Sequence, residues 1–477
     1  MLNEELKSTW LENYKTAPDQ LKKMSEVNGL ISAFNANIDA VIKVSGKKIE
    51  QLISKFNFNE KVILERAEKN IKTADDVFRG FVHCFKSGIA EEWLIQNVET
   101  FNWLNDHLGY DKMQMGGQGG IVANVMAVCN VSPVYVHGAS IPKEQASLFL
   151  DLPNLQSVGN DGKLKKANEI SRENNTPLIH WIIEFDKGDQ MSINGETFTC
   201  PKSNRFIATY DPLNFRLQID EDFAKAMSNP EIKNEYIILS GYQMLTETFS
   251  DGTKGTDRIE ASKAIIKKWK ENNQNAILHF EIASTQDKVI RKYLLDNLAK
   301  VSDSVGFNER ELIDLLEVMG EVELTKACEE KTNSVNLFKG MQKVFEYSNC
   351  HRLQLHMFGL YVTLQKKGYK ISPEQNRNGM QLAAVIAAAK AGTGAIDTHE
   401  VLLWAKDKEV SDIGLNELNE LSNYLKDVFG PNSLSETGMF ENNELEIIAI
   451  PTIIIDKPIT LVGMGDTISS VSLVAAR

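Results

Sequence analysis

Short apolar runs alternate along this chain with longer amphipathic segments, and this alternation restricts the fold more than any other feature of the sequence. The short runs suit strands buried on both faces, and the longer segments suit the helices that must connect parallel strands. The pattern therefore predicts an α/β fold with a mostly parallel central sheet flanked by helices. The candidate core strands are residues 29–34, 134–137, 236–240, 276–281, 304–307 and 353–360, and the clearest helices are 258–271, 286–299 and 380–391.

Two stretches depart from this pattern and predict a second, smaller α/β domain. Residues 42–112 are mostly charged helix with little strand character, and residues 176–216 contain two β-rich runs, 178–185 and 206–210. A length of 477 residues also exceeds what one hydrophobic core usually organises. We therefore expect residues 1–41, 113–175 and 217–477 to form the large domain, and residues 42–112 and 176–216 to form a lid folded over its edge.

The composition argues against several classes of partner. A formal net charge of −13 without a run of basic residues is unlike a nucleic-acid-binding protein. No apolar run approaches the ~18 residues that a membrane span needs, and the N-terminal segment has no apolar signal sequence. The five cysteines include no C-x-x-C pair, as expected for reduced thiols rather than for disulfides or a zinc site. We expect a cytoplasmic protein that binds neither nucleic acid nor membrane.

The segment Gly463-Met464-Gly465-Asp466 carries the clearest chemistry. It connects an expected strand, 459–462, to an expected apolar helix, 468–475. The two glycines allow the backbone to approach a ligand closely, and the helix N-terminus offers free N–H groups to a phosphate. The Asp466 carboxylate would then lie beside that phosphate and could accept a proton from an attacking hydroxyl. In the alternative interpretation, Asp466 only caps the helix.

Two other patterns limit how the C-terminal segment is interpreted. The run 459–462 follows another apolar run, 446–455, and together they predict a hairpin broken at Asp456-Lys457-Pro458. The chain contains no G-x-x-x-x-G-K-[ST] sequence, which excludes a P-loop. Any phosphate chemistry must therefore use the glycine turn and the helix N-terminus.

Three polar side chains follow the first expected strand. Asn35, Asn37 and Asp39 come directly after residues 29–34. Ligands of open α/β sheets bind at the carboxyl ends of the strands, which makes these residues candidates for a binding site. Alternatively, they only form the turn after the strand.

A run of glycines at residues 116–120 precedes an apolar helix. Gly117 permits close approach of the backbone to a ligand, and the Gln118 amide can both donate and accept a hydrogen bond. A hinge loop is the alternative interpretation.

Two glutamates lie at or just after the ends of expected strands. His279 and Glu281 end an expected strand on the same side, and Asn308 and Glu311 follow the strand 304–307 at the start of a helix. Their assignment to Mg²⁺ comes from the resemblance of these motifs to those of a known family, and such an ion is often held by one or two carboxylates, its waters and substrate phosphates. An exposed or capping role for Glu311 is the alternative.

Taken in order, these motifs resemble one family. Gly463–Asp466 is similar to the G-x-G-D motif of the ribokinase-like superfamily. The segments beginning at Asn35 and Gly116, with His279–Glu281 and Asn308–Glu311, are similar to the N-x-N-x-D, G-G-Q-x-G, H-x-E and N-x-x-E motifs of the ADP-dependent glucokinase/phosphofructokinase family. The resemblance spans nearly the whole chain and is strongest to the archaeal ADP-dependent phosphofructokinases.

The resemblance implies a ribokinase-like large domain, a lid, and Mg²⁺-assisted transfer of a phosphoryl group from ADP, with AMP released. It also implies a role for each motif residue. The catalytic group would comprise Asp466 as base with Gly463 and Gly465; the sugar site Asn35, Asn37, Asp39, Gly117, Gln118, His180, Arg205 and Arg216; the nucleotide site Asn308, Gly463, Met464 and Gly465; and the metal site Glu281, Glu311 and Asp466.

The accepting sugar is expected to be fructose 6-phosphate, with glucose as a second substrate. In this family a carboxylate on a lid helix favours glucose, and here either Glu91 or Glu92 could supply it, with Glu91 preferred. Arg216, or Lys166 in a lysine-rich run, could bind the sugar phosphate. We expect a monomer or a small homo-oligomer.

Three alternatives stay open at this point. Glucose could be the main acceptor, or the chain could be a ribokinase-like kinase that uses ATP on another small molecule. It could also be a non-catalytic regulator that binds a sugar or a nucleotide.

Overall fold

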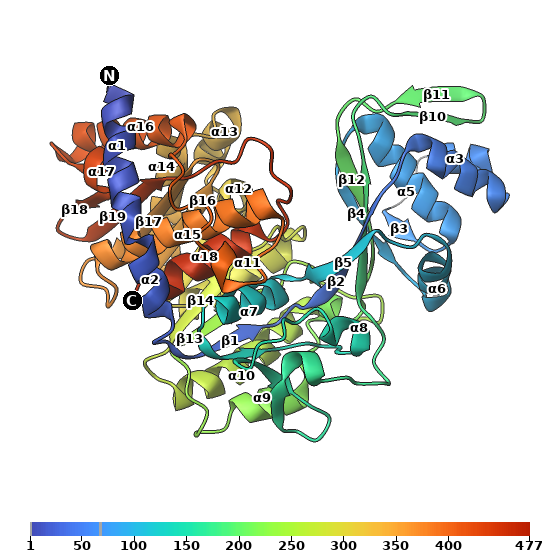
Figure 1. Cartoon of the computed structure of the whole chain (residues 1–477), viewed down its shortest axis with the longest axis horizontal. Coiled ribbons are helices and arrows are strands. Elements are labelled where there is room, and N and C mark those ends of the chain that lie inside the picture. Colours follow the sequence, from blue (N-terminus) through green and yellow to red (C-terminus); the bar gives the residue numbers. More distant parts are fainter. Residues whose placement is uncertain (1, 66–68) are drawn as a thin grey trace.

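The computed structural model describes residues 2–65 and 69–477, and it is built around an eleven-stranded sheet (Figure 1). Seven adjacent strands, from β16 through β15, β14, β13, β1 and β6 to β7, are parallel, and the strands outside them are antiparallel. In spatial order the strands are β18 (Met439–Glu441), β19 (Leu445–Pro451), β17 (Leu360–Lys366), β16 (Arg352–Met357), β15 (Ser304–Phe307), β14 (Ile277–Glu281), β13 (Tyr236–Leu239), β1 (Asn28–Ala33), β6 (Ser132–Val136), β7 (Leu155–Val158) and β8 (Leu164–Lys166).

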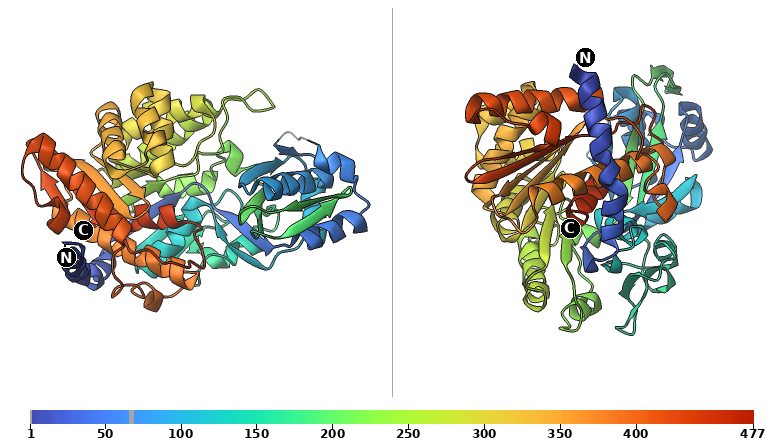
Figure 2. Two further views of the ribbon diagram at one scale, coloured as in Figure 1. Left: turned by 90° about the horizontal axis from the view of Figure 1, so that it is seen from above. Right: turned by 60° about the vertical axis from the view of Figure 1, so that its left-hand side comes forward.

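Helices cover both faces of this sheet, as the views in Figure 2 show. One layer packs α7, α18 and α15 side by side, and the other contains α10, α11, α12, α14 and α16. Their bounds are α7 (Gln118–Val128), α18 (Met464–Val474), α15 (Pro373–Thr393), α10 (Gly255–Asn272), α11 (Lys288–Asn297), α12 (Glu309–Met319), α14 (Ser334–Ser348) and α16 (Asp412–Phe429). The shorter or peripheral helices are α1 (Leu2–Asn13), α2 (Ala17–Met24), α8 (Lys143–Ala146), α9 (Glu221–Met227), α13 (Val322–Glu330) and α17 (Leu434–Thr437).

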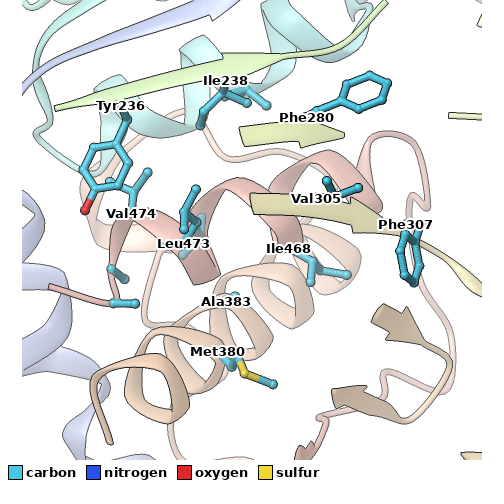
Figure 3. Close-up of a cluster of buried hydrophobic side chains, with 14 of the residues drawn as sticks. Tyr236, Ile238, Phe280, Val305, Phe307, Met380, Ala383, Ile468, Leu473 and Val474 are labelled. Atoms are coloured by element: carbon cyan, nitrogen blue, oxygen red, sulfur yellow. The ribbon is translucent and has the colours of Figure 1, made fainter. Parts of the chain in front are cut away.

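The contact between α15 and α18 is unusually close. Figure 3 shows Ile468, Leu473 and Val474 of α18 between the sheet and α15. A Cβ atom added at Gly379 of α15 would lie 2.5 Å from the carbonyl oxygen of Ser472. Because glycine lets the two backbones touch, α18 is held firmly beneath the sheet.

A second, six-stranded sheet forms a smaller lobe beside the large one (Figure 1). It packs against four helices around a separate core rich in aromatic side chains, including Phe78, Phe81, Trp181 and Phe206. The strand order is β3 (Asn70–Ile71), β4 (Glu91–Ile95), β12 (Asn204–Tyr210), β9 (Ile179–Phe185), β2 (Asn37–Lys43) and β5 (Lys112–Gly116). The helices are α3 (Gly46–Lys55), α4 (Glu60–Leu64), α5 (Ala74–Ser87) and α6 (Val98–His107), and β10 (Gln190–Ile193) pairs with β11 (Glu196–Thr199).

The predicted fold class is confirmed, including the mostly parallel sheet and the smaller α/β lobe. The predicted domain limits stay predictions; strands β2 and β5 of the smaller sheet draw on residues 37–41 and 113–116, beyond the ranges proposed for the lid. The range 42–112 also includes residues 66–68, which lie outside the described residues. Among the described residues, no helix is long and apolar enough to cross a bilayer.

Three expectations about strands were wrong. The run 353–360 is not one strand but β16, a turn at Gly359 and the first residue of the antiparallel strand β17. Residues 42–112 contain β4, a strand that pairs with β12. Residues 459–462 form no strand, because the chain leaves the sheet after Pro451 and exposes Ile459 and Leu461 by 66% and 65%. The expected C-terminal hairpin is therefore absent, and 446–455 pairs with β17 and β18 through β19 instead.

Candidate active site

A cavity of about 290 Å³ lies where the carboxyl ends of the parallel strands meet the smaller sheet. Both lobes contribute to its lining. The large lobe supplies Asn35, Gly117, Gln118, Ile121, Gln243, Met244, Leu461, Val462, Gly463 and Asp466, and the smaller sheet supplies Asn37, Asp39, Glu92, His180, Ile182, Arg205 and Ile207. The structure therefore brings together most of the sugar-site residues predicted from the sequence with the predicted base.

The glycine bend at Gly463 is the N-cap of α18. Gly463 has a φ of +63°, in the left-handed region that favours glycine, and an added Cβ would lie 2.6 Å from Ile121. The helix begins at Met464, earlier than the predicted start at 468, so Asp466 lies within its first turn. The N-cap is Gly463 and not Asp466, which excludes the interpretation of Asp466 as a simple N-cap.

The Asp466 carboxyl group is half-buried in this first turn. Burial raises its pKa, while a hydrogen bond from Gln118 and the charge of Lys390 oppose that shift. Carboxylates are also favoured near the positive end of a helix dipole. A half-buried carboxylate with a raised pKa is well suited to accept a proton, because its surroundings favour the protonated form.

The start of β2 forms a polar cradle on the opposite side of the cavity. Asn37 Nδ2 donates to Asp39 Oδ1 over 3.0 Å, and the side-chain oxygens of Asn35 and Asn37 are buried without a hydrogen-bond partner among the described residues. Gly117 fits closely against this cradle, since an added Cβ would lie 2.7 Å from Asn37 Oδ1. Buried acceptors without partners are costly, so these oxygens are suited to a ligand that donates hydrogen bonds, as sugar hydroxyls do.

His180 supplies a positive charge to the cavity. Burial lowers its pKa, but the Asp211 carboxylate at 3.1 Å from Nε2, together with Glu92 and Asp39, outweighs burial and raises the pKa to about 9. The imidazole is therefore protonated at neutral pH.

The two glutamates of β4 face opposite sides of the strand, as the alternation of side chains requires. Glu92 lines the cavity and accepts a hydrogen bond from Thr209 Oγ1 over 2.6 Å. Glu91 pairs with Lys69 at 2.8 Å and lines a separate cavity of about 640 Å³ in the smaller lobe. The structure thus places Glu92, and not the preferred Glu91, beside the predicted sugar site, and it places both on a strand and not on the expected helix.

Of the cations predicted to bind a phosphate, only one lines the cavity. Arg205 lines the cavity. Arg216 does not line it, because its guanidinium group pairs with Asp251 at 2.5 Å and lies over the ring of Phe249. Lys166 is paired with Glu169 at 3.0 Å and also contacts Asp151.

A buried group of potential metal ligands adjoins the bend. Ligand atoms of Glu281, Glu311 and His356 all lie within 4.8 Å of one another. Burial raises the pKa of Glu281 to about 7, and burial together with Glu281 raises the pKa of Glu311 well above its usual value. Because two buried carboxylates at this distance repel each other, a divalent cation would stabilise them, and the donor set fits such an ion.

Asp466, which we expected among the metal ligands, does not belong to this group. Asn308 acts as N-cap of α12, where it forms a capping box with Glu311. His279 Nε2 lies 3.1 Å from Glu281 Oε2, and burial lowers the pKa of His279 to about 3, so its ring is neutral.

Two residues of this region were missed by the sequence analysis. His356 lies at the carboxyl end of β16, and its position after an apolar run was a signal for a ligand-binding residue. Lys390 lies in the alanine-rich part of α15, and its Nζ donates to the Gly463 carbonyl oxygen over 3.2 Å. A lone lysine in a buried apolar helix was the available signal.

Comparison with known proteins assigns the chain to a family. The conserved region described as "ADP-specific Phosphofructokinase/Glucokinase conserved region" matches residues 28–475. The chain belongs to the ADP-specific phosphofructokinase/glucokinase family. This match spans every motif described above, from the cradle at Asn35 to the bend at Gly463.

Relatives in this family carry both names. The chain is 28% identical to an "ADP-specific phosphofructokinase" of Methanosarcina acetivorans, covering 94% of this chain and 93% of the relative. It is 31% identical to an "ADP-dependent glucose/glucosamine kinase" of Pyrococcus abyssi, covering 98% of each. A solved structure titled "ADP-dependent kinase complex with fructose-6-phosphate and ADPbetaS" is 29% identical, covers 98% of each chain and superposes with a TM-score of 0.82.

The raised pKa of His180 predicts a pH-dependent stability. Since the folded-state pKa of about 9 exceeds the usual value near 6.5, the stabilisation is complete below about pH 6.5 and is lost as the pH rises through 9. We expect His180→Gln to lower the free energy of unfolding by about 1–3 kcal/mol at pH 6.5, and the difference from the wild type to shrink towards pH 9. Urea unfolding across this range measures it. A difference that stays constant with pH would show that the imidazole is neutral in the folded protein.

Proposed function

We propose that this protein is an ADP-dependent sugar kinase that transfers the β-phosphoryl group of ADP to fructose 6-phosphate, yielding fructose 1,6-bisphosphate and AMP. The observation that carries the proposal is that one cavity contains both Asp466, in the first turn of α18, and the Asn37–Asp39 cradle. A base and a seat for hydroxyl groups therefore face the same space. The names of the family members support ADP as donor and sugars as acceptors.

In this mechanism the sugar is oriented by the cradle and Gln118, and Asp466 accepts the proton of the attacking hydroxyl. The N–H groups at the start of α18 face the transferring phosphoryl group and stabilise its charge. Closure of the smaller lobe over the cavity would exclude water, which would otherwise compete as acceptor.

The nucleotide is proposed to lie between the Gly463–Gly465 backbone and Asn308. Glu281, Glu311 and His356 would hold Mg²⁺, directly or through its waters, next to the phosphates. When bound, the ion would neutralise charge on the ADP phosphates.

The charges around the cavity favour fructose 6-phosphate and also admit glucose. Arg205 and the protonated His180 supply the positive charge that a sugar phosphate requires. Glu92 supplies a carboxylate that can accept hydrogen bonds from an unphosphorylated sugar. We therefore propose glucose as a second acceptor.

The proposed reaction is tested by measuring AMP formation with ADP or ATP as donor and fructose 6-phosphate or glucose as acceptor. We expect AMP and the sugar phosphate in equal amounts with ADP, and little turnover with ATP. We expect Asp466→Asn to lower kcat by about 10²–10⁴-fold, because the base is lost, while ADP binding measured by calorimetry is retained.

Asp412→Asn, at a carboxylate on the surface that pairs with Lys7, is the matched control and should keep wild-type turnover. Near-normal turnover by Asp466→Asn would refute the assignment of the base. Sugar binding without AMP formation would instead support a regulator, and turnover with ATP alone would support a kinase of another class.

The opposite orientation of the two glutamates predicts which one affects glucose. We expect Glu92→Gln to lower the ratio of kcat/KM for glucose to that for fructose 6-phosphate by about tenfold, since a charged hydrogen-bond acceptor is lost. Glu91→Gln, on the other face of β4, is the matched control and should leave the ratio unchanged. A change confined to Glu91→Gln would mean that the smaller lobe presents the other face of β4 to the sugar.

A further inference from the structure

Lys390 places a positive charge directly behind the glycine bend. It lies near the end of α15, and its Nζ donates to the Gly463 carbonyl oxygen over 3.2 Å and to Thr467 Oγ1 over 3.3 Å. Both partners are neutral, and within residues 2–65 and 69–477 no carboxylate oxygen pairs with this ammonium group within 4.0 Å. The ammonium group is thus held by uncharged oxygens rather than by an ion pair.

Keeping a charge in this position is costly. Burial lowers the pKa of Lys390 to about 8, although the carboxylates of Asp466 and Asp39 oppose the shift. Burying an ammonium group without an ion pair is unfavourable, and apolar residues precede Lys390 on α15, where residues 382–389 are all alanine, valine, leucine or isoleucine. Packing alone would be satisfied by a neutral side chain, so the charge requires another explanation.

The hydrogen bonds to Gly463 fix the orientation of one peptide group. The Gly463 carbonyl oxygen accepts from Lys390 Nζ, from the Thr467 backbone N–H over 3.2 Å and from Thr467 Oγ1 over 2.8 Å. In a planar trans peptide the N–H points away from the carbonyl oxygen. The N–H of Met464 therefore points out of the helix, towards the side where an anion is bound at a helix N-terminus.

The position of the Lys390 ammonium group also requires a small residue at position 463. A Cβ atom added at Gly463 would lie 3.0 Å from Lys390 Nζ, so any larger residue at the bend would press on the ammonium group. The lysine side chain further lines a cavity of about 300 Å³ behind the bend, together with Gly394, Ile396 and Val462.

We propose that Lys390 is a positioning residue for phosphoryl transfer: it locks the Gly463–Met464 peptide so that the Met464 N–H faces the transferring phosphoryl group, and it adds positive charge behind that group. The proposal rests on the proposed kinase function. It predicts an effect on the chemical step, because the interaction becomes stronger as charge develops on the phosphoryl oxygens.

The test compares Lys390→Met, Lys390→Ala and Lys390→Arg with the wild type in the AMP-forming assay. We expect Lys390→Met to lower kcat by about 10–100-fold and to change KM for the sugar by less than about threefold. Lys390→Arg, which keeps the charge, should retain more activity than Lys390→Met. Methylammonium should restore at least part of the lost kcat of Lys390→Ala, since it can occupy the vacated space from the adjoining cavity.

Lys370→Met is the matched control, because Lys370 also donates to a backbone carbonyl, that of Asn275 over 2.9 Å, at a distance from the site. It should keep wild-type kcat with and without methylammonium. Melting temperatures of all variants separate folding from turnover.

Three results would overturn the proposal: unchanged kcat in Lys390→Met, no response of folded Lys390→Ala to methylammonium, or failure of both neutral variants to fold, which would make the lysine a folding residue. An inactive wild-type protein would refute the proposed function itself, so the two failures are distinguishable.

Discussion

The orientation of the peptide group at Gly463 is the constraint on which the candidate site depends. Its carbonyl oxygen accepts hydrogen bonds from Lys390 and Thr467, so the N–H of Met464 in the same peptide group points the opposite way, out of the helix N-terminus. The φ of +63° favours glycine, and a Cβ atom added there would lie 2.6 Å from Ile121. The close packing of α18 on α15, through Gly379, holds this turn against the carboxyl ends of the parallel strands.

The second organising feature is the balance between carboxylates and cations that are buried or half-buried around the cavity. Burial raises the pKa of Asp39, Asp466, Glu281 and Glu311, so these carboxyl groups are less stable as anions than carboxylates at the surface. Cations from separate elements offset this effect, including His180 and Lys390. The Glu281 carboxylate packs directly against Gly306, because a Cβ atom added at Gly306 would lie 2.0 Å from Glu281 Oε2. Such a site gains stability when a cation and phosphates bind together.

Much of the architecture could be predicted from the sequence because strong local signals coincide with the fold. Buried parallel strands give continuous apolar runs, and the polar motifs follow them at the carboxyl ends, where the site forms. The failures arose where local pattern and tertiary environment disagree. Ile459 and Leu461 are apolar but exposed in a loop, and the hairpin turn at Gly359 interrupts a continuous apolar run. Whether Glu91 or Glu92 lines the cavity depends on which face of β4 points towards it. The apolar periodicity of this charged segment did not reveal that face.

The most direct test of the account is a structure of this protein with fructose 6-phosphate and a slowly transferred ADP analogue. The measured quantity is the distance from the Asp466 carboxylate to the sugar hydroxyl that faces the β-phosphorus. We predict about 2.6–3.2 Å, with the Met464 N–H directed at a β-phosphoryl oxygen. An acceptor hydroxyl that instead contacts another carboxylate, with the phosphoryl group away from the first turn of α18, would contradict the account.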